Sequence, residues 1–264
     1  MKSLKPRLSQ EGGVFIWSNS PMRSVTIPIL TYHQIDAAPP KGTPMRSLFV
    51  SPASFARQMA LLKRLGFQGL SMSALMPYLR GDKHGRVVGI TFDDGYLNNL
   101  QHALPVLQRH GFSSTCYVVS QRLGQTNDWD AALGVPSTAL MDWHDVRAWH
   151  AGGQEVGSHT QTHANLKALA LPDAQREIAQ SKHELEAQLG AAVTQFCYPF
   201  GVFSDEHAQA ARQAGYEAAT TTQRGRVQLA SATDYFHLPR IPVVRSTYLP
   251  QFLLKLLTSY EDSH

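Results

Sequence analysis

A short apolar run that ends in two carboxylates constrains this chain more than any other feature. Val87 to Phe92 is rich in β-branched and aromatic residues and stops at Asp93 and Asp94, with Gly95 following. Such a run predicts a buried strand, and the residues after it predict a turn. Adjacent carboxylates repel each other, so keeping both ionised requires a cation or strong hydrogen bonds. We therefore expect the fold to bring compensating groups to the end of this strand.

A second polar cluster also follows a strand-like run. Glu155 to Ser158 precedes His159 and His163. One Asp and two His form an N,N,O ligand set that suits Zn²⁺ with an open coordination position, the arrangement of a hydrolytic metal site. The other Asp of the adjacent pair would then be free to act as a base.

Each cluster also has a simpler interpretation. Asp-Asp-Gly is typical of a tight turn. The His pair could lie on a solvated helix face, and it lacks the Glu of the His-Glu-x-x-His zinc helix. Both clusters, however, follow a strand, which is where an α/β barrel places its catalytic residues. We therefore expect the two clusters to form one metal site.

Strand-like and helix-like runs alternate along the whole chain. The predicted strands are 25–32, 67–70, 87–92, 114–119, 155–158, 193–198, 216–222 and 237–244. Helix-like stripes separate them and no linker interrupts the order, which predicts a single parallel α/β barrel. The segments 34–49 and 124–140 are longer than simple connections, and whether they act as lids stays open.

Composition and charge narrow the expected partners and location. The 264 residues carry a net charge of +4, but Lys and Arg are scattered, so nucleic-acid binding is not expected. We find no integral membrane segment and no signal peptide, which predicts a cytoplasmic protein. Residues 1–22 are expected to be a disordered extension ahead of one domain, 23–264. Cys116 and Cys197 lie in apolar runs, which predicts buried free thiols.

Three motifs together resemble a known enzyme family. They are Thr91-Phe92-Asp93-Asp94-Gly95-Tyr96, Ser158-His159-Thr160-Gln161-Thr162-His163 and Tyr198-Pro199-Phe200-Gly201. Their order and spacing are similar to those of the polysaccharide deacetylases of carbohydrate esterase family 4, the NodB-homology domain, over about residues 25 to 245. The resemblance implies a distorted, seven-stranded TIM-like (β/α) barrel. It also implies hydrolysis of an N-acetyl group on a sugar with a divalent metal, most often Zn²⁺, with Co²⁺, Mn²⁺ or Ni²⁺ as alternatives.

The resemblance also assigns roles to the polar residues of the first two motifs. It makes Asp93 the general base that activates a metal-bound water. The metal ligands that it implies are Asp94, His159 and His163. A carboxylate can complete the deprotonation because the metal lowers the pKa of its water to about 7.

The third motif is expected to hold the reacting carbonyl. By resemblance, the backbone N–H of Phe200 donates to the oxyanion, and Tyr198 and Pro199 of the same motif line the substrate site. Such a donor acts on charge that develops only in the tetrahedral state, and one donor can contribute about 3 kcal/mol.

Two departures from the family pattern change the expected site. The third motif usually begins with an Arg that orients the base, but Cys197 stands at that position. Arg240, in a later strand, is therefore our candidate partner for Asp93. The usual late Leu-His motif is not evident either. Tyr32-His33 at the end of the first strand is similar to the Tyr-His of the poly-N-acetylglucosamine deacetylase subgroup, so we expect His33 to protonate the leaving amine or to contact the site.

These features favour one function and leave two alternatives. We expect a metal-dependent deacetylase that acts on an N-acetylated glycan or glycolipid precursor. A hydrolase of a small non-sugar amide and a non-catalytic carbohydrate-binding relative are the alternatives. The identity of the sugar and the oligomeric state stay open.

Overall fold

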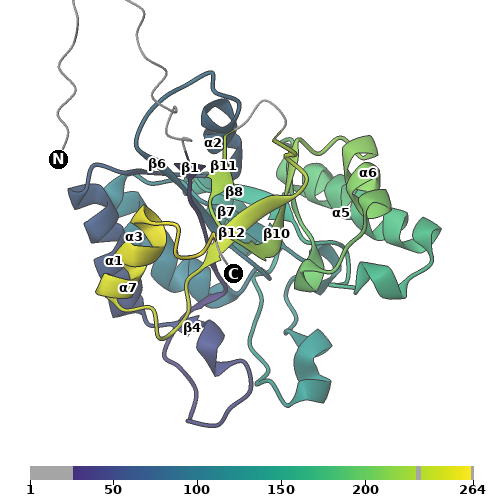
Figure 1. Cartoon of the computed structure of the whole chain (residues 1–264). Coiled ribbons are helices and arrows are strands. Elements are labelled where there is room, and N and C mark those ends of the chain that lie inside the picture. Colours follow the sequence, from purple (N-terminus) through teal and green to yellow (C-terminus); the bar gives the residue numbers. More distant parts are fainter. Residues whose placement is uncertain (1–25, 230–232, 263–264) are drawn as a thin grey trace, which may run out of the picture.

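A closed ring of parallel strands forms the centre of the molecule (Figure 1). The computed structural model describes residues 26–229 and 233–262, so the expected extension at 1–22 lies outside the described residues. The ring strands in spatial order are β2 (Ile29–Tyr32), β12 (Leu238–Pro242), β10 (Ala218–Arg224), β9 (Gln195–Cys197), β8 (Glu155–Ser158), β7 (Thr115–Val118) and β6 (Val87–Phe92). β2 pairs with β6 and closes the ring, while β5 (Gln68–Leu70) pairs with the start of β6. The predicted seven-stranded barrel is confirmed.

Helices cover the outside of the ring (Figure 1), and several of them begin at side-chain caps that the sequence predicts. The helices are α1 (Pro52–Arg64), α2 (Met72–Leu79), α3 (Leu104–His110), α4 (Trp143–Ala151), α5 (Leu171–Leu189), α6 (Asp205–Gln213) and α7 (Leu249–Leu257). Ser51 and Ser71 accept hydrogen bonds from the first turns of α1 and α2, and Asp142 forms a capping box at α4. Gly190 ends α5 in the left-handed conformation.

Proline accounts for two differences from the predicted elements. Pro28 divides the first predicted strand, so that β1 (Thr26–Ile27) leaves the ring and pairs antiparallel with β11 (Val227–Gln228). The apolar stripe around Pro105 forms a π-helical segment, Asn99–Ala103, followed by α3. Pro105 has no N–H to donate to the preceding turn, which explains the break in regular α-helix.

The two long segments contain short regular elements. The segment 34–49 holds β3 (Gln34–Ile35) and a 3₁₀ turn, Arg46–Leu48, before β4 (Phe49–Val50). The segment 124–140 holds a 3₁₀ turn, Asp128–Leu133. Both segments line the pocket described below, beside the carboxyl ends of the ring strands.

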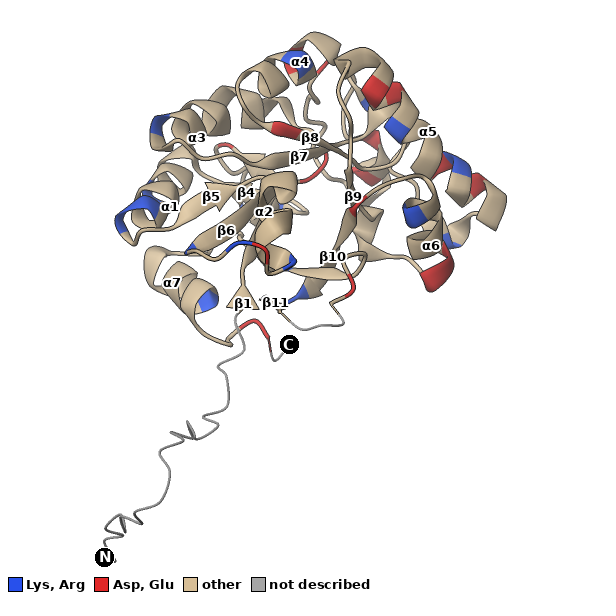
Figure 2. Cartoon of the chain, turned by 90° about the horizontal axis from the view of Figure 1, so that it is seen from above, with Lys and Arg blue, Asp and Glu red and all other residues tan. Residues whose placement is uncertain are grey.

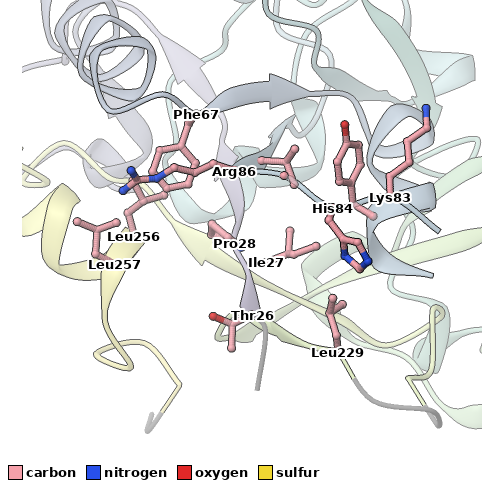
Figure 3. Close-up of a pocket in the computed structure, with 13 residues that line it drawn as sticks. Thr26, Ile27, Pro28, Phe67, Lys83, His84, Arg86, Leu229, Leu256 and Leu257 are labelled. Atoms are coloured by element: carbon pink, nitrogen blue, oxygen red, sulfur yellow. The ribbon is translucent and has the colours of Figure 1, made fainter. Parts of the chain in front are cut away.

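A separate groove lies at the amino-terminal end of the ring (Figure 3). It has a volume of about 360 Å³ and is lined by the starts of β1 and β6 and the end of α7. Its basic residues are Lys83, His84 and Arg86, and the Arg86 guanidinium lies 4.6 Å from the centre of the Phe67 ring. Among residues 26–229 and 233–262, no carboxylate forms an ion pair with these three side chains.

Charge is mixed on the helical exterior. Figure 2 shows Lys and Arg interspersed with Asp and Glu along α5. None of the helices in the described part of the chain has the length and apolarity that crossing a membrane requires.

Candidate active site

The two adjacent carboxylates lie in the turn that ends β6. Asp93 N donates to the Tyr32 carbonyl at 3.0 Å, which ties the turn to β2. Asp94 and Gly95 have positive φ angles of 73° and 76°. Such a backbone conformation is uncommon for a residue with a side chain and often marks a functional site. The two carboxyl groups consequently meet different partners.

Arg240 is the partner of Asp93. Its Nη1 lies 2.7 Å from Asp93 Oδ1 and its Nη2 lies 2.8 Å from Oδ2, a bidentate ion pair. Arg240 is 1% exposed and also donates to the Thr221 carbonyl and the Cys197 sulfur. Burial alone would raise the pKa of Asp93, but the charge and hydrogen bonds of Arg240 lower it below the ordinary carboxyl value. The contact expected from the sequence is therefore present, and Asp93 is held as a carboxylate.

Cys197 occupies the position at which the family usually has Arg. It is a buried free thiol on β9, as the sequence predicted for both cysteines. Its sulfur lies 3.3 Å from Arg240 Nη2. The Arg240 guanidinium thus extends to Asp93 from β12 and lies beside Cys197, the position on β9 that the family usually fills with Arg.

Asp94 faces both histidines of the second motif. Asp94 Oδ1 lies 3.5 Å from His159 Nε2 and 3.3 Å from His163 Nε2. The three side chains are buried, and their nearest donor atoms lie within 4.8 Å of one another. Burial would raise the pKa of Asp94, but hydrogen bonds from the two imidazoles hold it well below the usual range. Converging oxygen and nitrogen donors fit a divalent ion such as Zn²⁺.

Neighbouring groups fix the orientation of His159 and of its loop. His159 Nδ1 lies 2.7 Å from the Cys197 carbonyl, which can only accept, so Nδ1 carries a proton and Nε2, which faces Asp94, is the nitrogen that could bind a metal ion. Glu177 on α5 accepts hydrogen bonds from the backbone N–H groups of Gln161 and Thr162 at 2.9 and 3.0 Å. The loop between the two histidines is therefore anchored to α5.

The remaining predicted residues lie around the same pocket. His33 Nε2 is 3.9 Å from Asp93 Oδ2. Phe200 is 46% exposed and has a positive φ of 58°. Tyr198 lines the pocket, but its ring stacks on Phe203 and its hydroxyl donates to the Phe236 carbonyl, so its side chain serves packing.

The turn of the third motif is tightly packed. Pro199 was expected to line the substrate site, but it is buried and does not line the pocket, and its carbonyl accepts from Val202 N at 3.1 Å. Gly201 has a φ of 67°, and a Cβ there would lie 1.8 Å from Thr222 Oγ1. Only glycine fits this approach, which fixes the path of the backbone at Phe200.

The pocket itself has a polar floor and largely apolar walls. It measures about 350 Å³. Met45 and Leu48 of the segment 34–49 form one side, and Trp129 and Asp130 of the segment 124–140 line it as well. Burial and the nearby Asp94 carboxylate raise the pKa of Asp130.

Sequence reasoning missed Trp129, Asp130 and Glu177 as parts of the site. The signals that could have found the first two were the unexplained length of the segment 124–140 and its Asn-Asp-Trp-Asp sequence. Glu177 lies within an ordinary mixed-charge helix, and no local pattern distinguishes it.

Comparisons with known proteins agree with this geometry. The family model described as polysaccharide deacetylase matches residues 80–219. YxkH of Bacillus subtilis, which carries the name of a polysaccharide deacetylase, is 28% identical over 217 residues, covering 81% of this chain and 71% of YxkH. A poly-beta-1,6-N-acetyl-D-glucosamine N-deacetylase of Staphylococcus epidermidis is 23% identical over 209 residues, covering 77% of this chain and 71% of that protein.

A solved structure shares the fold over nearly the whole of its chain. The Streptococcus pyogenes deacetylase PplD in complex with acetate superposes with a TM-score of 0.75 at 25% identity. The match covers 88% of this chain and 99% of PplD.

Proposed function

This chain belongs to the polysaccharide deacetylase family, hydrolases of carbon–nitrogen bonds other than peptide bonds, and we propose that it removes acetyl groups from an amino sugar with the help of a divalent ion. The substrate class in this proposal is an N-acetylated polysaccharide, oligosaccharide or glycolipid precursor. One observation carries it. An arginine-paired carboxylate, Asp93, and the donor set of Asp94, His159 and His163 face one pocket.

The donor set of one carboxylate and two imidazoles is the support for a metal ion, and these ligand types favour Zn²⁺. When held by Asp94, His159 and His163, the ion supplies polarisation of the amide carbonyl and a lowered pKa for water. The tautomer of His159 suits this role, because Nδ1–H is committed to the Cys197 carbonyl and Nε2 is left to bind.

Asp93 takes the proton from the water that attacks the amide carbon. Arg240 donates to both carboxylate oxygens and Thr31 Oγ1 donates to Oδ2 at 3.4 Å, so a lone pair of Oδ1 is the one left to accept a proton. The ion pair also keeps Asp93 ionised and prevents its rotation. General-base catalysis of this kind contributes roughly 10²- to 10⁴-fold in rate.

His33 is the proposed proton donor to the leaving amine. Its Nε2 lies 3.9 Å from Asp93 Oδ2, and both side chains line the pocket. The proposed base Asp93 and the proposed acid His33 are therefore close enough to act on the same amide. We expect His33→Ala to slow turnover and to lose one limb of the pH–rate profile. A variant that keeps both limbs and the full rate would exclude this role.

The backbone N–H of Phe200 is the proposed oxyanion donor. The close approach of Gly201 to Thr222 fixes the turn that presents it, so its position is set before substrate binds. The apolar walls of the pocket reduce water access around the developing charge, which strengthens such an interaction.

Acetate release from N-acetylglucosamine oligomers tests the function. The purified protein is stripped with a chelator and assayed with and without added Zn²⁺. We expect release only with the metal. Tightly bound metal without release from any sugar oligomer would instead favour a small non-sugar amide as substrate, which an assay on such amides would detect, or a non-catalytic role.

A further inference from the structure

The two histidines of the donor set are held in different ways. His159 is oriented by a hydrogen bond from Nδ1 to a carbonyl, the usual arrangement for a metal-binding histidine. The Nδ1 atom of His163 is buried and has no hydrogen-bond partner among the described residues. Another interaction must therefore fix the plane of the His163 ring.

Aromatic rings surround His163 on two sides. The Trp129 ring stacks on it with centroids 4.3 Å apart and an interplanar angle of 23°. The Phe200 ring meets it edge-on, with centroids 4.5 Å apart at 74°. Rotation of the imidazole about its side-chain bonds would bring it into one ring or the other.

We propose that Trp129 is a positioning residue that aims His163 Nε2 at the divalent ion in place of a hydrogen bond to Nδ1. The inference rests on the metal site of the proposed function and goes beyond it, because Trp129 belongs to none of the three motifs. It also gives the segment 124–140 a role: the 3₁₀ turn Asp128–Leu133 carries Trp129 to the site.

The backbone of His163 increases the need for such support. Its φ of 62° places it in the left-handed region, and its N–H is bound to Thr160 Oγ1 at 3.1 Å. Backbone strain at this residue persists only if surrounding contacts determine the conformation. Flat stacking supplies a contact that selects one ring plane, whereas an aliphatic side chain of similar volume does not.

Metal affinity of three variants tests the proposal, measured by competition with a chromophoric Zn²⁺ chelator. Trp129→Leu keeps an apolar side chain but removes the flat face, and we expect Zn²⁺ to bind about 10- to 100-fold more weakly. Trp129→Phe restores a flat ring and is expected to bind closer to wild type than to the Leu variant. Phe200→Leu, at an exposed position that the fold tolerates, should weaken binding by a smaller factor.

A second tryptophan provides the matched control. Trp143 is partly buried against the core at the start of α4, outside the pocket, so Trp143→Leu is expected to leave metal affinity unchanged. The absorption spectrum of bound Co²⁺ reports ligand geometry without any turnover, and we expect it to change in Trp129→Leu alone of the two Trp→Leu variants.

The outcomes separate this inference from the function on which it rests. A wild-type protein that binds no divalent ion would refute the proposed metal site. Metal binding by the wild type together with an unchanged Zn²⁺ affinity in Trp129→Leu would refute only the positioning role. If Trp129→Leu does not fold, a Trp129→Phe variant that binds Zn²⁺ about 10- to 100-fold more weakly than the wild type would overturn it, because a flat ring at this position would then not be what orients His163.

Discussion

Two hollows of nearly equal size lie at opposite ends of one barrel, and only one of them has the organisation of an active site. The pocket at the carboxyl ends measures about 350 Å³ and the groove at the amino-terminal end about 360 Å³. In the pocket, Asp93 and Asp94 are buried and each meets oppositely charged or hydrogen-bonding groups. In the groove, Arg86 lies over an aromatic ring without a carboxylate partner among the described residues.

The difference shows that the arrangement of charge identifies a site better than its volume. Burying an ion pair costs desolvation energy that an apolar pair would avoid, so such a pair requires an explanation beyond stability. Exposed basic residues around a groove carry no such cost. We therefore infer function at the end where charges are buried and mutually constrained.

The largest effect is expected from Arg240→Met. This change leaves the Asp93 carboxylate buried without its counter-charge, and breaking a buried pair in this way destabilises a protein by about 3–5 kcal/mol. Chemical denaturation measures the loss. Arg86→Met in the groove is the matched control and should change the unfolding free energy by no more than about 1 kcal/mol, the contribution of an exposed cation–π contact. Equal losses of unfolding free energy in the two variants would contradict the difference between the pocket and the groove.

The same variant has a pH signature. In the wild type, the pKa of Asp93 is lowered in the folded protein, so its stabilising contribution is present above the ordinary carboxyl pKa and is lost as pH falls through the folded value. Without Arg240, burial raises the pKa of Asp93. The acid limb of the rate profile should therefore move to higher pH. The effect of Asp93 on stability should change sign, because protonation of the unpaired carboxylate removes a buried charge, so the variant should regain part of its lost stability as pH falls through the raised pKa. Adding Asp93→Asn to Arg240→Met should recover part of the stability, because the isolated charge is removed.

A smaller effect is expected from Glu177→Gln. Its carboxylate accepts two backbone N–H groups and the Thr162 hydroxyl, and an uncharged amide accepts these bonds more weakly. We expect a loss of roughly 1–2 kcal/mol in unfolding free energy and weaker metal binding, because the loop carrying His163 is less constrained. Glu186→Gln is the control, because Glu186 lies on the same helix, pairs with the buried Lys182 and accepts from Val193 N, and does not line the pocket. Metal affinity lowered equally by both changes would show that α5 acts only through overall stability.

The sequence predicted the barrel and the residues that converge on its floor, because both follow from local patterns. Strand ends in a parallel barrel meet at one face, so Asp93, Asp94, His159 and His163 could be placed together without coordinates. Arg240 was predicted because the third motif has Cys197 where an arginine was expected. The base Asp93 therefore needed another basic partner, and Arg240 in a later strand provides it.

Residues that depend on irregular backbone could not be predicted in this way. Trp129 lies in a 3₁₀ turn with no hydrophobic period, and its stacking on His163 depends on the path of the whole segment 124–140. The π-helical segment forms before Pro105 because proline has no backbone N–H to donate to the preceding turn. From the sequence, the same proline predicts only a bend in a regular helix. Contacts of this kind are set by tertiary packing.

The division of labour between the two adjacent carboxylates is the central claim, and parallel measurement of bound metal and acetate release in Asp93→Asn and Asp94→Asn tests it most directly. We predict that Asp93→Asn retains about one Zn²⁺ per chain and loses roughly 10²- to 10⁴-fold in rate, since it removes only the base. Asp94→Asn should lose the metal and the activity together. Loss of metal from Asp93→Asn, or full retention in Asp94→Asn, would contradict the account.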